Sequence, residues 1–316
     1  MMDFSPSVLD GTEKLIYSLR DLYVKHGYKR YKMSKFEEYA LYGRNIDFLV
    51  SEGVITFTDT DGKLMALKPD VTLSIVKNAP DDADSVTKLC YNESVYRVSK
   101  GTGTFREITQ AGLECIGCVT PELVGEVLSL AAESLALTGR RFVLEVSHLG
   151  LTAGVVNSLT DDAELKSALI SCAGEKNVQG MIRLCRGAGI SDDESASLVT
   201  LVTTYGTPDE VLEKLSRAEL FDGADGYIAE LRSALGATEN VAGGEVLVDF
   251  SVTADVNYYN GVVFKGFVEG APRDVLSGGQ YDRLMKKMGK RSRAVGFAVY
   301  LDALERLLCD ADGREE

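Results

Sequence analysis

Tight-turn sequences between strand-forming segments restrict the folds open to this chain. Asp61-Gly62 and Asn260-Gly261 each follow a segment rich in β-branched and aromatic residues and precede another. Both dipeptides favour two-residue hairpin turns, because the two central residues of such a turn need positive φ. Further strands are expected at residues 86–98, 104–117, 142–150 and 293–300. The sequence therefore predicts a largely antiparallel sheet.

Helical periodicity accounts for much of the remaining chain. Residues 13–26 carry apolar side chains at helical spacing and are followed by Gly27, which can adopt the left-handed cap conformation. Residues 151–240 show helical periods broken by short polar turns. A sheet flanked by helices and interrupted by a helical insertion is an α+β architecture. We expect a core domain formed by residues 1–150 and 241–316, with the helical insertion at 151–240.

The charge balance argues against a nucleic acid as the main partner. The net charge is −14 and the isoelectric point is about 4.8, so a polyanion would be repelled. The basic cluster at residues 286–293 is expected in a solvated loop between a helix and a strand. No apolar segment is long enough for a signal peptide or a membrane span, so we expect a cytoplasmic protein without a membrane partner.

Cysteine and histidine usage argues against a metal site. The six cysteines lie mostly in apolar segments. Cys115 and Cys118 form a C-x-x-C pair, but no second pair or histidine cluster accompanies them, so buried, reduced thiols are the favoured interpretation. The only histidines are His26 and His148. Neither a P-loop nor a dinucleotide-binding glycine motif is present. We therefore expect no metal and no cofactor.

One predicted strand carries polar residues that could form a binding site. Period-two alternation places Gln110, Gly112 and Glu114 on the same face of the strand. The glycine between the two polar residues allows close approach to the backbone, and an amide with a carboxylate would suit an ammonium group. From this strand alone, the polar side of a solvent-exposed edge strand is the favoured alternative.

Two other segments allow both a functional and a structural interpretation. Asp70 and Thr72 follow Pro69 and could accept hydrogen bonds from the same cation, but Asp70 could equally cap a helix. Tyr258 and Tyr259 are adjacent, so on a strand only one of them could enter a pocket. Packing in the aromatic core is the more common role for such a pair.

In sequence order, these segments resemble the histidyl-tRNA synthetase family of class II aminoacyl-tRNA synthetases. Residues 88–117 resemble the family's motif 2, residues 277–289 with 293–304 resemble the segment that ends in motif 3, and residues 253–264 resemble the histidine-specific stretch. The resemblance covers most of residues 10–150 and 243–308. It implies the class II synthetase fold, an antiparallel sheet flanked by helices.

The resemblance also implies a pocket for L-histidine. Arg97 matches the motif 2 arginine, whose planar guanidinium holds a carboxylate through bidentate hydrogen bonds. The other positions that match the family's amino-acid pocket are Asp70, Thr72, Gln110, Glu114, Tyr258, Tyr259 and Tyr281.

Departures from the family fall on the adenylation machinery. Ala303 stands at the motif 3 arginine, Ala254 at the arginine of the histidine-specific stretch, Ser99 at a motif 2 acid and Ile108 at the position that stacks on adenine. Transfer at a phosphate depends on positioned positive charge, so two lost arginines argue against adenylation. We expect no catalytic residues. The motif 1 proline is Ser34 here, and a dimer is still expected.

The chain ends shortly after motif 3, which predicts that it lacks an anticodon-binding domain and does not bind tRNA. With these losses it is similar to the regulatory subunits that pair with the short catalytic form of ATP phosphoribosyltransferase in histidine biosynthesis. That similarity implies a non-catalytic subunit that binds L-histidine and forms a homodimer within a hetero-oligomer. The alternatives are a stand-alone adenylating or amino-acid ligase enzyme, and an amino-acid sensor with another partner.

Overall fold

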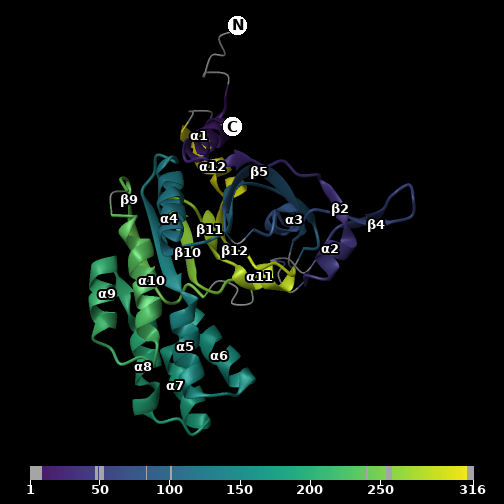
Figure 1. Ribbon diagram of the computed structural model, residues 1–316. Helices are drawn as coiled ribbons and strands as arrows, with labels where there is room; N and C mark the ends of the chain where they lie inside the picture. The colour runs from purple at the N-terminus through teal and green to yellow at the C-terminus, as the bar shows by residue number, and fades with distance from the viewer. Residues whose placement is uncertain are drawn as a thin grey trace.

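A mixed sheet of nine strands forms the centre of the molecule (Figure 1). The computed structural model describes residues 9–46, 49, 53–82, 84–99, 102–239, 241–253 and 258–311. In spatial order the strands are β1 (Lys29–Arg30), β5 (Val86–Val98), β6 (Phe105–Gly117), β12 (Arg293–Tyr300), β11 (Leu276–Gln280), β10 (Val262–Val268), β7 (Phe142–His148), β9 (Gly244–Asp249) and β8 (Tyr205–Gly206). Most neighbours are antiparallel, as predicted, but β1 pairs with β5 and β7 with β9 in parallel.

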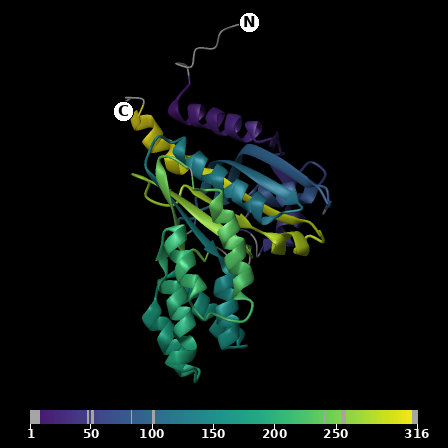
Figure 2. The ribbon, with the colours of Figure 1, turned by 60° about the vertical axis from the view of Figure 1, so that its left-hand side comes forward.

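Helices precede, interrupt and follow the strands. They are α1 (Gly11–Lys25), α2 (Tyr39–Gly43), α3 (Thr72–Asn78), α4 (Pro121–Ala136), α5 (Leu149–Leu159), α6 (Ala163–Gly174), α7 (Val178–Gly187), α8 (Asp192–Thr203), α9 (Pro208–Ser216), α10 (Ala224–Gly236), α11 (Asp282–Lys287) and α12 (Leu301–Ala311). Helices α6 to α8 extend away from the sheet in Figure 2, whereas α9 contacts β9 and α10 packs on α4. The α+β class is confirmed, and the segment expected to be helical also contributes β8 to the sheet.

One face of the sheet packs against α1, α4 and α12 and forms the larger apolar core. Helix α4 begins where Thr120 accepts a hydrogen bond from the Leu123 N–H and Pro121 occupies the first turn. Its apolar stripe, including Val127 and Leu128, is fully buried. The described part of α4 is therefore packed tightly against the sheet.

The opposite face lies under a smaller layer. That layer contains α2, α3, α11 and a three-stranded antiparallel sheet of β2 (Phe36–Glu38), β4 (Leu64–Leu67) and β3 (Thr56–Thr58). Tyr42, Leu73 and Ile75 are fully buried there in a second apolar cluster, which also includes Tyr281. The space between this layer and the central strands holds the cavity described below.

Both predicted two-residue hairpins are wrong. Strands β3 and β4 do pair, but residues 59–63 connect them, with the Asp59 carboxylate accepting hydrogen bonds from the N–H groups of Asp61 and Lys63. Only Gly62 of the predicted turn has positive φ. Asn260 and Gly261 lead into β10, which pairs with β7 and β11 rather than with the preceding strand β9. Long-range pairing therefore decides this topology.

The described cysteines are free thiols. Cys90, Cys115 and Cys185 are buried as expected, whereas Cys118 of the C-x-x-C pair is exposed. In the ranges that the structure covers, no group of three or more histidine, cysteine or acidic residues could hold a metal ion. Within the same ranges, no helix is both long and apolar enough to cross a membrane.

Two leucines of the α4 segment test the packing on the first face. Leu128 is fully buried, so Leu128→Ala should lower the free energy of unfolding by about 2 to 5 kcal/mol through lost burial and a cavity. Leu137→Ala, at the C-cap where the side chain is 42% exposed, should cost less than about 1 kcal/mol. Urea unfolding measures both, and equal losses would show that α4 does not pack as described.

Candidate ligand-binding site

A cavity of about 430 Å³ lies on the pocket side of the central strands. The structure brings together every residue that the sequence predicted for an amino-acid site. These are Asp70, Thr72, Arg97, Gln110, Glu114, Tyr258, Tyr259 and Tyr281. They come from the segment around α3, from β5 and β6, and from the segments before β10 and α11.

Small residues in neighbouring strands make the floor of the cavity. Gly112 of β6 lies opposite Ala298 of β12, and Glu114 lies opposite Gly296, so these four residues share one face of the sheet. A Cβ atom at Gly296 would lie 1.8 Å from Oε2 of Glu114. The Glu114 carboxylate therefore rests directly on the backbone of β12.

Glu114 is the most deeply placed acid of the cavity, with 2% of its surface exposed. Its Oε1 accepts a hydrogen bond from Thr72 Oγ1 at 2.7 Å, and its Oε2 accepts one from the Tyr281 hydroxyl at 2.6 Å. Burial raises the pKa of the Glu114 carboxyl to about 8, although the two hydroxyl groups lower it in part. The alternative of a solvent-exposed edge strand is wrong, since β6 lies between β5 and β12.

The Asp70 side chain bonds to the backbone at the start of α3 and also faces the cavity. Its carboxylate accepts a hydrogen bond from the Leu73 N–H at 2.8 Å at the start of α3, and it also lines the cavity. Burial raises its pKa, and the nearby Arg97 guanidinium opposes that effect. Arg97 is positioned by a hydrogen bond from its Nε to the Pro69 carbonyl at 3.0 Å. Glu114, Asp70 and Arg97 thus line the same cavity.

Tyrosine rings form an aromatic wall. The ring centroids of Tyr258 and Tyr259 lie 4.7 Å apart, and those of Tyr258 and Tyr281 lie 5.9 Å apart. Both members of the adjacent pair line the cavity, so the prediction that only one could enter is wrong. The reason is that residues 258–261 precede β10 and do not follow strand alternation. Aromatic faces beside acidic groups suit a cationic or planar ligand.

The sequence did not identify several lining residues. Lys265 of β10 lies opposite Ser277 of β11, which lies opposite Ala298 of β12, so all three continue the floor. The Tyr300 hydroxyl lies 2.5 Å from Ser277 Oγ. Asp274 also lines the cavity. Only the strand register brings these residues together, and no local motif marks them.

The positions that depart from the synthetase pattern lie in different surroundings. Ala303, at the start of α12, packs against the core on the opposite face of the sheet. Ile108 packs at the edge of the second apolar cluster. Ser99 closes the β5–β6 connection by donating its N–H to the Thr104 carbonyl at 2.8 Å. Ala254 lies outside the described residues.

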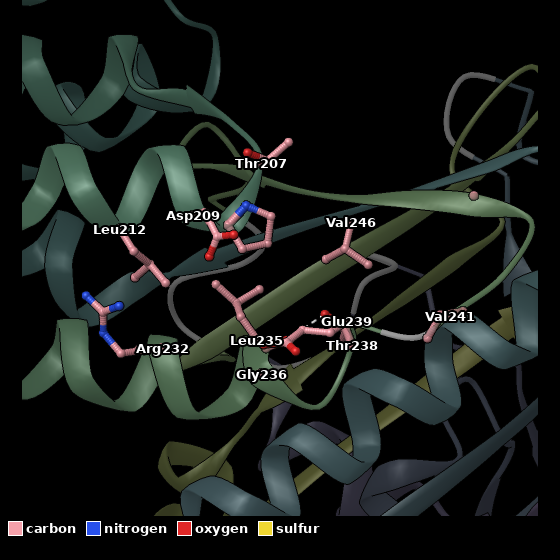
Figure 3. Close-up of a pocket in the computed structure, with 12 residues that line it drawn as sticks. Thr207, Asp209, Leu212, Arg232, Leu235, Gly236, Thr238, Glu239, Val241 and Val246 are labelled. Atoms are coloured by element: carbon pink, nitrogen blue, oxygen red, sulfur yellow. Dashed lines mark hydrogen bonds between the residues drawn. The ribbon is translucent and has the colours of Figure 1, made fainter.

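A second cavity, of about 390 Å³, lies between α9, α10 and β9 (Figure 3). Apolar side chains such as Leu212 and Leu235 line it together with Asp209, Arg232 and Glu239. These three charged residues are all exposed. This cavity therefore lacks the buried acidic groups that distinguish the first one.

The close contact between Glu114 and β12 can be tested with glycine substitutions. Gly296→Ala would place a methyl group 1.8 Å from the Glu114 carboxylate and 2.4 Å from the Leu113 carbonyl, so it should lower the free energy of unfolding by about 1 to 3 kcal/mol. Gly226→Ala, in open space on α10, is the control and should be neutral or stabilising by up to about 1 kcal/mol. A Gly296→Ala protein as stable as the Gly226→Ala control would contradict this geometry.

Comparisons with known proteins agree with the fold and extend it. The family model described as histidyl-tRNA synthetase matches residues 1–304. An ATP phosphoribosyltransferase regulatory subunit from Caldanaerobacter subterraneus subsp. tengcongensis is 30% identical over 308 residues, which cover 96% of this chain and 80% of the relative.

Two solved structures share the fold. One is an ATP phosphoribosyltransferase regulatory subunit/histidyl-tRNA synthetase from Bacillus halodurans, with a TM-score of 0.80 and 24% identity over 100% of this chain and 83% of the other. The second is a chain of the ATP phosphoribosyl transferase (HisG:HisZ) complex from Thermotoga maritima, with a TM-score of 0.70 and 19% identity over 95% of this chain and 98% of the other. The chain therefore belongs to the histidyl-tRNA synthetase family and, within it, to the ATP phosphoribosyltransferase regulatory subunits.

Proposed function

We propose that this chain is a non-catalytic, cytoplasmic subunit that binds L-histidine in the first cavity. We further propose that it docks on the short catalytic chain of ATP phosphoribosyltransferase, activates that chain and relays feedback inhibition by L-histidine. The observation that carries the proposal is the grouping of Glu114, Asp70 and Arg97 with three tyrosines in one partly enclosed cavity.

The charges of the cavity match those of a free amino acid. Glu114 and Asp70 can accept an ammonium group, and Gln110 beside them offers an amide oxygen. Arg97 can hold a carboxylate. The tilted rings of Tyr258 and Tyr259 offer aromatic faces that suit a planar side chain such as imidazole. Each charged part of L-histidine thus has a complementary partner among the lining residues.

A regulatory role also fits the loss of the adenylation groups. Ala303 supplies no positive charge and packs away from the cavity. The described cationic residues that line the cavity are Arg97 and Lys265, and Asp274 is an acid of the same lining. Positioned positive charge is the main requirement for reaction at a phosphate, so this cavity is better suited to binding than to adenylation.

The relatives support the catalytic chain as one proposed partner, and an exposed surface supports a second copy of this chain as another. The Thermotoga maritima structure is of a complex that pairs two named subunits, which supports a catalytic chain as the partner here. Phe36 and Phe57 contact each other edge to face on the small sheet and are 50% and 38% exposed. Exposed aromatic pairs are typical of protein interfaces. We propose that a second copy of this chain covers them in a homodimer.

The complex of this protein with the short catalytic chain should be the active form. Formation of phosphoribosyl-ATP by the short catalytic chain of the same organism should appear only when this protein is added, and it should fall when L-histidine is added. The control is the catalytic chain alone. A catalytic chain that is fully active alone and indifferent to this protein would contradict the proposal.

A matched pair of glutamates on β6 tests the binding site. Glu114→Gln should weaken L-histidine binding by about 1.5 to 3 kcal/mol, because it removes a charge-assisted hydrogen bond. Glu107→Gln, on the same strand but exposed and bonded to the Tyr96 hydroxyl, should leave the affinity unchanged. Titration calorimetry measures both. Equal affinities for the two variants would show that Glu114 does not contact the ligand.

A further inference from the structure

The surroundings of Glu114 supply hydrogen bonds but no neutralising charge. Among the residues that the structure describes, no lysine, arginine or histidine side chain is hydrogen-bonded to either oxygen of its carboxyl group. The two bonds that it does accept come from the neutral hydroxyl groups of Thr72 and Tyr281. Either hydroxyl can also accept a hydrogen bond from the O–H of a neutral carboxylic acid.

Among the titratable groups around Glu114, Asp70 raises the pKa of its carboxyl, as burial does, whereas the Tyr281 hydroxyl lowers it. Asp70, from the segment before α3, is an acid in the same cavity. Tyr91 on β5, Tyr258 before β10, Tyr281 before α11 and Cys115 on β6 all have pKa values raised by burial, and proximity to Glu114 adds to each shift. On the β12 side, Glu114 faces the backbone of Gly296.

Arg97 lines the same cavity, and its guanidinium acts on Asp70. It lowers the pKa of Asp70, and its Nε is engaged with the Pro69 carbonyl. A carboxylate buried without a counter-charge is unfavourable, and such a group takes up a proton instead. A ligand that brings a positive charge would reverse this balance.

We propose that Glu114 carries a proton in the empty cavity and gives it up when the ammonium group of a ligand binds. The O–H bond of the carboxylic acid breaks, the proton passes to solvent, and the carboxylate that remains pairs with the ammonium group, which is already charged at neutral pH. This inference rests on the proposed function for the identity of the ligand, L-histidine.

Proton exchange would make feedback inhibition sensitive to pH. Below the pKa of the empty site, binding competes with protons for Glu114, so the affinity for L-histidine should rise severalfold between pH 7 and pH 8. A fall in pH would then weaken inhibition at a fixed concentration of L-histidine. The cavity would thereby link an amino-acid signal to the acidity of its compartment.

Calorimetric titration of L-histidine into the full chain at pH 7 tests the exchange. Run in two buffers with different ionisation enthalpies, it reports the number of protons released for each ligand bound. We expect nearly one for the native protein and none for Glu114→Gln, while Glu107→Gln should behave like the native protein. L-histidine that binds without proton release would overturn the inference and leave the proposed function intact. A protein that does not bind L-histidine would contradict the proposed function and the exchange with it.

The ligand-free protein provides an independent test. Because the pKa of Glu114 is about 8 in the folded state and its ordinary value is 4.5, the folded state keeps a proton that the unfolded chain has lost. The folding equilibrium constant of the native protein, relative to Glu114→Gln, should therefore fall as the pH rises from about 4.5 to about 8, by up to about tenfold per pH unit. A parallel pH dependence of the two proteins would overturn the inference.

Discussion

Glu114 places an acidic group in the middle of the large sheet, where water cannot solvate it. This is possible because Gly296 leaves room for the carboxylate on β12 and because Thr72 and Tyr281 donate hydrogen bonds to it. The remaining lining residues are arranged around this acid. Asp70 adds a second acidic group, the tyrosine rings form a wall, and Arg97 and Lys265 also line the cavity. The site therefore depends on an acid that needs a positively charged ligand to be stable as a carboxylate.

The two faces of the sheet have different roles. Apolar packing of α1, α4 and α12 stabilises one face. The other face carries the cavity under α3 and α11, while helices α6 to α8 lie apart from it (Figure 2). Ala303 belongs to the packed face, so a residue at a former reaction position now contributes to the core. The chain thus shares its fold with synthetases and belongs with the regulatory subunits.

The sequence was informative where a local pattern determines the structure. Strand alternation correctly placed Gln110 and Glu114 on one face, because that period follows from backbone geometry. It could not show that β6 is central, since that depends on β12, which is distant in sequence. Lys265 was missed for the same reason, because only the register of β10 with β11 brings it to the cavity floor. The turn predicted at Asn260 failed because tertiary pairing overrides a local preference.

Thermodynamic linkage offers the most direct test of the regulatory account. If L-histidine acts through this chain on the catalytic chain, the two sites share a coupling free energy, and each ligand must change the affinity of the complex for the other. The measurement is the dissociation constant of L-histidine for the complex, with and without saturating ATP and phosphoribosyl donor. The account predicts weaker L-histidine binding when both substrates are present, by about fivefold or more. An unchanged dissociation constant would contradict it.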